Sequence, residues 1–313
     1  MKNVDVKAGD GERERIRAVM DKVRQIEIRT RHLVDDTVAG HYRAVFRGRG
    51  LDFDSVREYV PGDEVRAIDW NVTARAGRPF VKQFREEREL TIWILVDVSG
   101  SGEFGSGATT KREVAAEIAC VLALSAVRND DKVGLIMFSD QIEVQVSPAK
   151  GRAHVMRLVR EILTCRPRGR GTDIAGAVEL AGRLAVRRSV MFLVSDLELP
   201  ADGGRALAAI ERAARPVAAR HDVIAVEVRD PHERALPNLG LVTVEDAETG
   251  DVMTLDTGRR RVRERFAALA EKRDADTRRS FARLGVETLP LDTATPYLPV
   301  LLGFFERRER RLG

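Results

Sequence analysis

Three residues with oxygen-bearing side chains follow an apolar segment at residues 91–96. The segment "TIWILV" ends in Asp97, and Ser99 and Ser101 occupy alternate positions after it, before several glycines. Carboxylate and hydroxyl oxygens are the ligands that hard cations such as Mg²⁺ prefer. The glycines allow a tight turn and leave room for an incoming group. The pattern D-x-S-x-S therefore predicts a cation site at the tip of a strand.

Two later segments supply more oxygen atoms of the same kind. The loop "RGTDIAG" presents Thr172 just before a helical pattern, and the apolar segment "SVMFLVSD" ends in Asp196. Ligands of open parallel sheets bind beyond the carboxyl ends of the strands, where the strand order reverses. We expect the hydroxyls of Ser99, Ser101 and Thr172 to hold Mg²⁺ directly, with Mn²⁺ or Ca²⁺ as substitutes. Asp97 and Asp196 would then neutralise the ion from behind the hydroxyls.

A cation held by neutral oxygens keeps much of its positive charge. Such an ion should take a further anionic ligand from outside, most naturally a carboxylate on another protein. This mechanism binds a partner without a catalytic base. The sequence therefore favours a non-enzymatic interaction protein that depends on a divalent metal.

Two alternatives remain open on the residues alone. Taken singly, Asp97 and Thr172 could cap helices, and the serines could bond loop amides. An aspartate at a strand tip with Mg²⁺ also fits a phosphoesterase, although that site would want a second carboxylate at position 99, which is Ser99. The glycines before Lys111 lack P-loop spacing, and the five histidines are dispersed.

Apolar strands alternating with helical patterns must position these residues. Strands are expected at "TIWILVDVS", "SVMFLVSD", "HDVIAVEVRD" and "VETLPL", with hairpins at "KVGLIMFSDQIEVQVS" and "LGLVTVEDAETGDVMTLDT". This rhythm predicts an α/β fold with a doubly wound, mostly parallel sheet and helices on both faces. Residues 91–313 would form that domain, including a C-terminal helical extension. Residues 1–39 would form a helical segment, and residues 40–90 a small strand-rich module that contains "HYRAVF" and "RPFVKQF".

The oxygen ligands resemble a known metal site. "DVSGS", with Thr172 in "RGTDIAGAV" and Asp196 in "LVSDLE", is similar to the metal-ion-dependent adhesion site of von Willebrand factor A domains. The resemblance implies direct ligation by the three hydroxyls, with the two aspartates acting largely through water. Two segments at the rim of the site depart from the pattern of these domains. Gly102-Glu103-Phe104 stands where many relatives carry a methionine, and Leu197 follows Asp196 in place of glycine.

The preceding segment "RGRGLDFDSVREYVPGDEVRAIDWNVTARAGRPFVKQF" resembles the signature of the bacterial family known as domain of unknown function 58. The matching positions are Gly48, Gly50, Phe53, Arg57, Tyr59, Pro61, Gly62, Asp63, Arg66, Asp69, Trp70, Ala74 and Arg75. The resemblance implies a chaperone-like partner or adaptor of a MoxR-type AAA+ ATPase, or of its client, in protein assembly or metal insertion. Some members of the family carry membrane helices.

Within that signature, residues 59–63 predict a turn, since proline fixes φ and glycine permits a positive φ. Trp70 is expected to be a core anchor beside an arginine, either Arg57 or Arg66. The module would then be a salt-bridged structural unit, and the alternative is a docking surface.

Composition limits the remaining classes. The formal charge is +4, with 43% hydrophobic and 33% charged residues, which is typical of a soluble globular protein. Basic clusters are interleaved with acidic residues and lack aromatic platforms, so nucleic-acid binding is not expected. No apolar segment reaches membrane-spanning length, and the N-terminus lacks a signal-peptide core, so a cytoplasmic location is expected. Cys120 and Cys165 are expected to be buried thiols.

Overall fold

The computed structural model describes residues 20–30, 33–34, 38–46, 52–85, 89–199, 204–247 and 249–312. They form two compact units. The smaller unit spans Phe46–Leu90, and the larger one comprises Met1–Val45 and Thr91–Gly313. Each unit is described by itself below.

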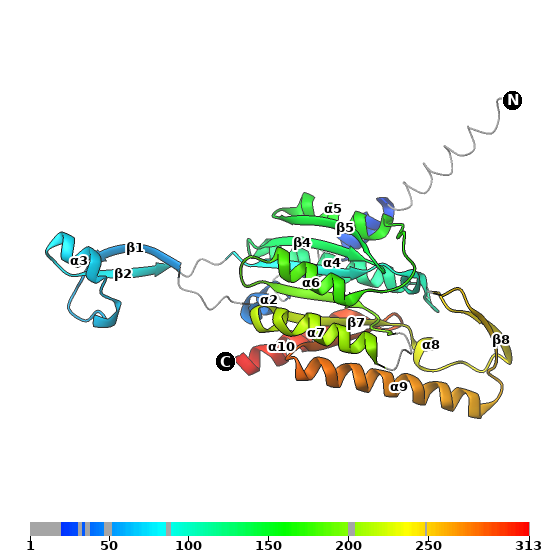
Figure 1. Cartoon of the computed structure of the whole chain (residues 1–313). Helices are drawn as coiled ribbons and strands as arrows, with labels where there is room; N and C mark the ends of the chain where they lie inside the picture. The colour runs from blue at the N-terminus through cyan, green and yellow to red at the C-terminus, as the bar shows by residue number, and fades with distance from the viewer. Residues whose placement is uncertain are drawn as a thin grey trace. The chain divides into compact units, whose positions relative to one another are not determined.

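A six-stranded sheet forms the centre of the larger unit (Figure 1). Its strand order is β10-β7-β6-β3-β4-β5, and every neighbouring pair is parallel except β4 and β5. The strands are β3 (Thr91–Asp97), β4 (Lys132–Phe138), β5 (Ile142–Ala149), β6 (Val190–Ser195), β7 (Asp222–Arg229) and β10 (Glu287–Asp292). This topology confirms the predicted doubly wound, mostly parallel sheet.

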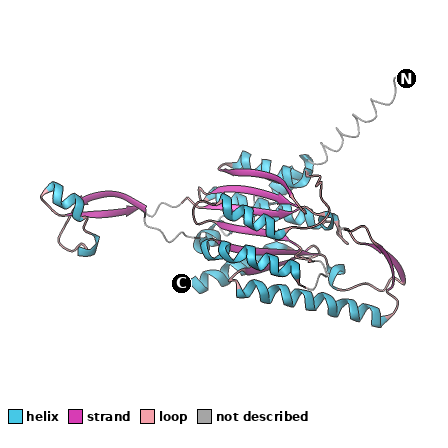
Figure 2. Ribbon diagram, in the orientation of Figure 1, coloured by secondary structure: helices cyan, strands magenta, loops and turns pink. Residues whose placement is uncertain are grey.

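Helices cover both faces of the sheet, as Figure 2 shows. Trp93 and Leu95 of β3 pack against α6 (Ile174–Leu184) and α7 (Arg205–Arg220) in one buried cluster. The opposite face contacts α4 (Lys111–Arg128), which is buried along most of its length. A helix that is apolar on nearly all sides belongs inside the protein. Between residues 91 and 312 the structure also describes the helices α5 (Arg152–Thr164), α8 (Pro231–Arg234), α9 (Arg260–Arg283) and α10 (Tyr297–Leu312).

The strand order reverses between β3 and β6. From β3 the chain continues to β4 and β5 on one side of the sheet, whereas β6, β7 and β10 follow on the other side. A crevice therefore opens beyond the carboxyl ends of β3 and β6. Asp97 is the last residue of β3, and Asp196 directly follows β6.

Both predicted hairpins are present. β4 and β5 pair antiparallel within the large sheet. β8 (Leu241–Glu245) and β9 (Val252–Asp256) form a separate two-stranded sheet. The C-terminal helix buries Leu301 and Phe305, while Cys120 is buried and Cys165 is only half-buried.

The segment "HYRAVF" is a helix, not the expected strand. It belongs to α2 (Ala39–Phe46), in which Tyr42, Val45 and Phe46 are buried at helical spacing. The Tyr42 hydroxyl donates to Oδ2 of Asp131 at 3.0 Å, which ties α2 to the larger unit. Burial together with this carboxylate raises the pKa of Tyr42 well above its usual range. The observed boundary of the small module thus differs from the predicted start at residue 40.

The smaller unit pairs β1 (Asp52–Glu58) with β2 (Phe80–Arg85) around a short 3₁₀ helix η2 (Val65–Ala67) and α3 (Trp70–Ala76). The predicted turn is confirmed, because Asp63 N donates to Val60 O at 3.0 Å and Gly62 has a φ of 113°. Arg57 donates to both carboxylate oxygens of Asp63, at 2.6 and 2.7 Å. These bonds lower the pKa of Asp63 to about 2.

Trp70 is not a core anchor, and that prediction is wrong. Its side chain is 66% exposed at the first position of α3. Arg57, one of the two arginines expected beside it, pairs with Asp63 instead. Asp69 caps the helix by accepting from Asn71 N and Val72 N, at 3.0 and 3.2 Å. The cap fixes the start of α3 at Trp70, whose side chain is exposed.

Residues 20–30 of the predicted N-terminal helical segment are helical, whereas residues 1–19 lie outside the described residues. Gly48 and Gly50 of the signature segment also lie outside them. Of the helices that the structure describes, none combines the length and the apolar character that crossing a bilayer requires.

Candidate metal centre

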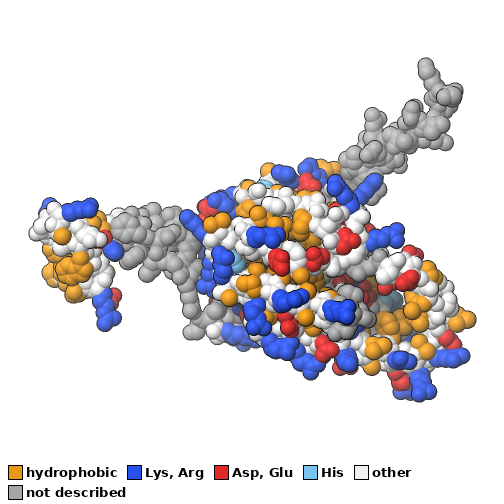
Figure 3. All heavy atoms as spheres, in the orientation of Figure 1, with side chains coloured by type: hydrophobic (Ala, Val, Ile, Leu, Met, Phe, Trp, Pro, Cys, Tyr) orange, Lys and Arg blue, Asp and Glu red, His pale blue; other side chains and the backbone are white. Residues whose placement is uncertain are grey.

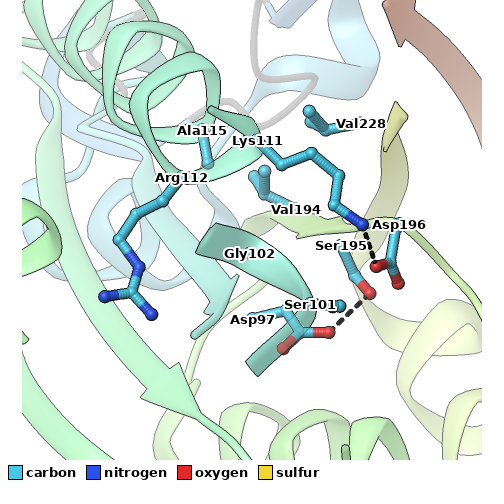
Figure 4. Close-up of a pocket in the computed structure, with 10 residues that line it drawn as sticks. All are labelled: Asp97, Ser101, Gly102, Lys111, Arg112, Ala115, Val194, Ser195, Asp196 and Val228. Carbon is cyan, nitrogen blue, oxygen red and sulfur yellow. Dashed lines mark hydrogen bonds and ion pairs between the residues drawn. The ribbon is translucent and has the colours of Figure 1, made fainter. Parts of the chain in front are cut away.

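Four of the five predicted site residues converge at the switch point between β3 and β6. Asp97, Ser101 and Asp196 line one small crevice together with Ser195 and Lys111 (Figure 4). The side chains of Asp97 and Ser195 point toward each other, as do those of Lys111 and Asp196. The fourth predicted residue, Ser99, follows β3 and joins the crevice through its contact with Ser101.

The two serine hydroxyls are adjacent. After β3 the chain enters a short 3₁₀ turn, η3 (Gly100–Glu103), which brings Ser99 Oγ within 3.2 Å of Ser101 Oγ. Neighbouring ligands of an octahedral Mg²⁺ at about 2.1 Å lie about 3 Å apart. The spacing of the two hydroxyls thus suits two such ligands.

Asp97 supports the serines rather than pointing into open space. Its Oδ1 accepts from Ser99 N at 2.9 Å, and its Oδ2 accepts from Ser195 Oγ at 2.8 Å. Burial, followed by the nearby negative charge of Asp196, raises the pKa of Asp97 to about 7. A buried carboxylate with this pKa gains from a positive charge nearby. Both oxygens already have partners, which fits the predicted role behind the hydroxyls.

Asp196 is held by an ammonium group. Its Oδ2 lies 2.7 Å from Lys111 Nζ, and its Oδ1 accepts from Glu198 N at 3.0 Å. Burial alone raises the pKa of Asp196, but the charge and hydrogen bond of Lys111, together with the hydrogen bonds from Glu198 N and Ser101, outweigh it, so the pKa is lowered. Asp196 is therefore an anion whose charge is already partly balanced within the protein.

Sequence reasoning missed Lys111. Its side chain is buried, and it also contacts Glu233 of α8. A capping box between Thr110 and Glu113 starts α4 and aims this lysine, the first residue of the helix, into the crevice. The sequence signal is a lysine just inside a capped helix that follows the metal-site loop, but its partners lie 85 and 122 residues away.

The loop that carries Thr172 lies beside the serine turn. Gly100 N donates to Arg170 O at 3.3 Å, and Asp173 N donates to Ser139 O at 2.7 Å. The Glu143 carboxylate accepts from Arg168 N and Gly169 N at 2.8 and 3.0 Å, which fixes the middle of the loop. Thr172 is half-buried at the end of this loop. Its neighbour, not Thr172 itself, caps α6, since Asp173 accepts from Gly176 N at 2.9 Å.

The residue after Asp196 adopts a conformation that favours glycine. Leu197 has a φ of 55° and is buried. Left-handed backbone at a bulky residue stores strain, which persists only where the surroundings impose it. Here Leu197 N donates to Ser195 Oγ at 3.0 Å, and the leucine side chain packs in the core. Leucine in place of glycine at position 197 therefore still allows the turn after β6, and its side chain adds a contact in the core.

Among the residues that the structure describes, no cluster of three or more His, Cys, Asp or Glu side chains could hold a metal ion. The candidate site is instead built from hydroxyls backed by two carboxylates. The pair of serines and the raised pKa of Asp97 both fit a hard cation. Ser99, Ser101 and Thr172 would hold the ion, and Asp97 and Asp196 would balance its charge.

Sequence comparison places the chain among proteins without a described function. The family model described as "Protein of unknown function DUF58" matches residues 55–276. An uncharacterised protein of Mycobacterium tuberculosis strain H37Rv is 32% identical over 292 residues, covering 92% of this chain and 89% of the relative. The uncharacterised protein YeaD of Bacillus subtilis is 27% identical over 142 residues, covering 45% of this chain and 33% of the relative.

Solved structures with partial similarity include the conserved hypothetical protein BatB from Bacteroides thetaiotaomicron. It is 18% identical with a TM-score of 0.45, and the match covers 71% of this chain and 99% of that one. The VWA domain of SpRpn10 is 14% identical with a TM-score of 0.37, covering 69% and 95% of the two chains. The fold assignment depends on the strand order of this chain, not on these overlaps.

Proposed function

This chain belongs to the DUF58 family of proteins of unknown function, and we propose that it is a divalent-metal-dependent protein interaction module. The observation that carries the proposal is the pair of serine hydroxyls 3.2 Å apart at the end of β3. They lie where the strand order reverses, with Asp97 and Asp196 beside them. The ion would be Mg²⁺, with Mn²⁺ or Ca²⁺ as substitutes.

A bound metal ion would supply the positive charge that attracts an acidic side chain of a partner, and that side chain would ligate the ion. The chain's own residues define the rest of the site. Ser99 is fully buried, and Ser101 sits on the η3 turn, so the hydroxyls are fixed before a partner arrives. Such preorganisation reduces the entropy lost on binding.

We propose a non-enzymatic role because the charged groups at the site hold and position other residues. Both oxygens of Asp97 accept hydrogen bonds, and Lys111 is paired with two carboxylates. Neither group is left to act as a nucleophile or base. A phosphoesterase would use the same aspartate, so phosphate release from p-nitrophenyl phosphate is the test of that reaction, and we expect none.

The family resemblance supports an AAA+ ATPase of the MoxR type, or a client of one, as the partner. In this proposal the partner contributes a carboxylate to the metal. The chain would act as an adaptor in protein assembly or metal-cofactor insertion.

Mn²⁺ binding tests the proposal without any partner. The full chain is titrated with Mn²⁺, and free ion is followed by electron paramagnetic resonance, for wild type, Ser99→Ala and Ser101→Ala. Ser189→Ala is a matched control, because Ser189 is a buried serine at the amino end of β6 and bonds Arg187 O. We expect both site variants to lose Mn²⁺ binding while the control keeps it. Equal binding by all four proteins would refute the metal site.

A second measurement tests the partner. The immobilised chain is incubated with a purified MoxR-type ATPase from the same organism, in Mg²⁺ or in EDTA. We expect retention in Mg²⁺ only, and none by Ser99→Ala. Retention that persists unchanged in EDTA and in the variant would show that the contact does not use the metal.

A further inference from the structure

The turn of the β8–β9 hairpin lies against both loops of the candidate metal centre. A Cβ atom on Gly100 would lie 2.6 Å from the carbonyl oxygen of Ala247, so only glycine fits under this turn. At the other side of the turn, a Cβ atom on Gly250 would lie 3.4 Å from a guanidinium nitrogen of Arg170. The hairpin, the serine turn and the loop before Thr172 therefore form one continuous surface.

The loop before Thr172 carries a dense positive charge, and we call residues 166–170 the arginine loop. Arg166, Arg168 and Arg170 alternate along it and are all exposed. None of the three makes an ion pair with another residue that the structure describes. Most arginines of α9 and α10 differ, because they pair with neighbouring carboxylates. Unpaired guanidinium groups at the rim of a cleft attract anionic ligands.

The hairpin next to the arginine loop exposes apolar side chains. Leu241, Val252 and Met253 are each more than half exposed, and hydrophobic side chains gather over this region in Figure 3. β8 and β9 pair only with each other, so each strand has an outer edge without a partner strand among the described residues. An isolated two-stranded sheet is marginally stable in water, and an added strand stabilises it.

We propose that the arginine loop and the β8–β9 hairpin form one docking surface for an extended segment of a partner protein, in which acidic residues alternate with apolar ones. Its acidic side chains would pair with the three arginines, and its apolar side chains would cover Leu241, Val252 and Met253. This inference rests on the proposed function in one respect only, namely that one acidic residue of the segment also reaches the metal.

A nucleic acid fits the same surface less well. The arginines could bind phosphates as well as carboxylates, so the apolar part of the surface distinguishes the two kinds of ligand. The exposed side chains of the hairpin are aliphatic, and bases stack on aromatic rings. Covering an aliphatic side chain removes apolar surface from water, which stabilises a complex with an apolar peptide but not one with a phosphate backbone.

The test uses a fluorescent ten-residue peptide that alternates Glu and Val, with a Lys–Val peptide as the charge control. Binding to the full chain is measured by anisotropy in Mg²⁺. One triple variant changes Arg166, Arg168 and Arg170 to Ala, and a second changes Leu241, Val252 and Met253 to Ser. We expect each to weaken binding of the Glu–Val peptide by about tenfold or more, as loss of several central contacts does. The matched control changes Arg183, Arg187 and Arg188 to Ala, which are exposed near the amino end of β6.

The outcomes separate this inference from the proposed function. Equal losses in the two arginine triples, no binding by wild type, or tighter binding of a single-stranded oligonucleotide at the same residues would each overturn the docking surface. Mg²⁺ binding is measured by calorimetry on the same proteins, and we expect it to be unchanged in all three triples. If wild type binds the peptide through these residues but binds no Mg²⁺, the proposed function fails while the docking surface stands.

Discussion

Lys111 Nζ lies 2.7 Å from Oδ2 of Asp196, in a crevice where both side chains are buried. The same ammonium contacts Glu233, so one internal cation balances a buried carboxylate and a partly buried one. Because Asp196 is one of the residues expected to balance a bound metal ion, Lys111 and the metal compete for the same negative charge. The protein therefore carries its own cation next to the site.

Lys111→Met tests this relationship. Without Mg²⁺ the variant should lose about 3–5 kcal/mol of unfolding free energy, because the buried Asp196 and the partly buried Glu233 lose their cationic partner. Mg²⁺ should then stabilise the variant more than wild type, since the ion replaces the lost positive charge. Urea unfolding with and without Mg²⁺ measures both effects. Lys150→Met is the control, because its partner Asp130 is exposed and such pairs contribute about 0–1 kcal/mol. Equal stabilisation of variant and wild type by Mg²⁺ would contradict the competition.

A buried ion network supports the strand tips. Arg229 pairs with Glu227 at 2.9 Å and donates from Nε to Asp196 O at 3.1 Å. Glu227→Gln should lower the unfolding free energy by about 1.5–3 kcal/mol, because it removes one of the two buried carboxylates that pair with Arg229, while Asp274 remains. Glu264→Gln on α9 removes an exposed i,i+4 partner of Arg260 and should cost less than about 1 kcal/mol. Chemical denaturation compares the two, and similar small costs would show that the network does not matter for stability.

Truncation of the two tryptophans should have very different effects on the unfolding free energy. Trp70 is 66% exposed and Trp93 is 2% exposed. Trp70→Ala should change the unfolding free energy by no more than about 0.5 kcal/mol. Trp93→Ala should cost about 3–5 kcal/mol, because it empties part of the core between β3 and α6. Thermal unfolding of both variants provides the comparison. A large loss in Trp70→Ala would restore the core role that its exposure argues against.

Asp230 should make the stability of the fold depend on pH in the acid range. Its carboxylate accepts from Ser106 N, His232 N and Thr293 Oγ1, at 2.8, 2.9 and 2.7 Å. Burial alone would raise the pKa of Asp230, but these donors outweigh it and lower the pKa to about 2. A carboxyl with a lowered folded-state pKa stabilises the fold above its unfolded pKa of about 4, and this contribution is lost as the pH falls to about 2.

Asp230→Asn isolates that contribution. The amide nitrogen cannot accept from the same donors, so we expect a loss of about 1–3 kcal/mol at neutral pH. The difference from wild type should shrink between pH 4 and pH 2, as the wild-type carboxyl takes up its proton. Unfolding midpoints across this range measure it. A difference that stays constant down to pH 2 would mean that the charge of Asp230 is not responsible.

The strand-tip residues could be predicted from the sequence because each belongs to a local pattern. An apolar strand ending in Asp97 with serines at alternate positions needs no knowledge of distant contacts, and the same holds for Asp196. Lys111 could not be found in this way, since its role depends on carboxylates brought near by the sheet topology. A buried lysine reads in sequence as one more charged residue of a helix start.

Two further differences have similar causes. "HYRAVF" carries both a strand-like alternation and a helical stripe, and in the structure the helical stripe is the one that is buried, with Tyr42 bonded to Asp131. Trp70 is a large apolar residue, and such residues are usually buried. In α3 it occupies the first position after the Asp69 cap and is exposed, and composition does not reveal this placement.

The central claim is that hydroxyls at the switch point hold a divalent ion, and Mn²⁺-soaked crystals of the full chain test it most directly. The account predicts an anomalous peak bonded to the side-chain oxygens of Ser99, Ser101 and Thr172. Well-ordered density for these residues with no anomalous peak among them would contradict it.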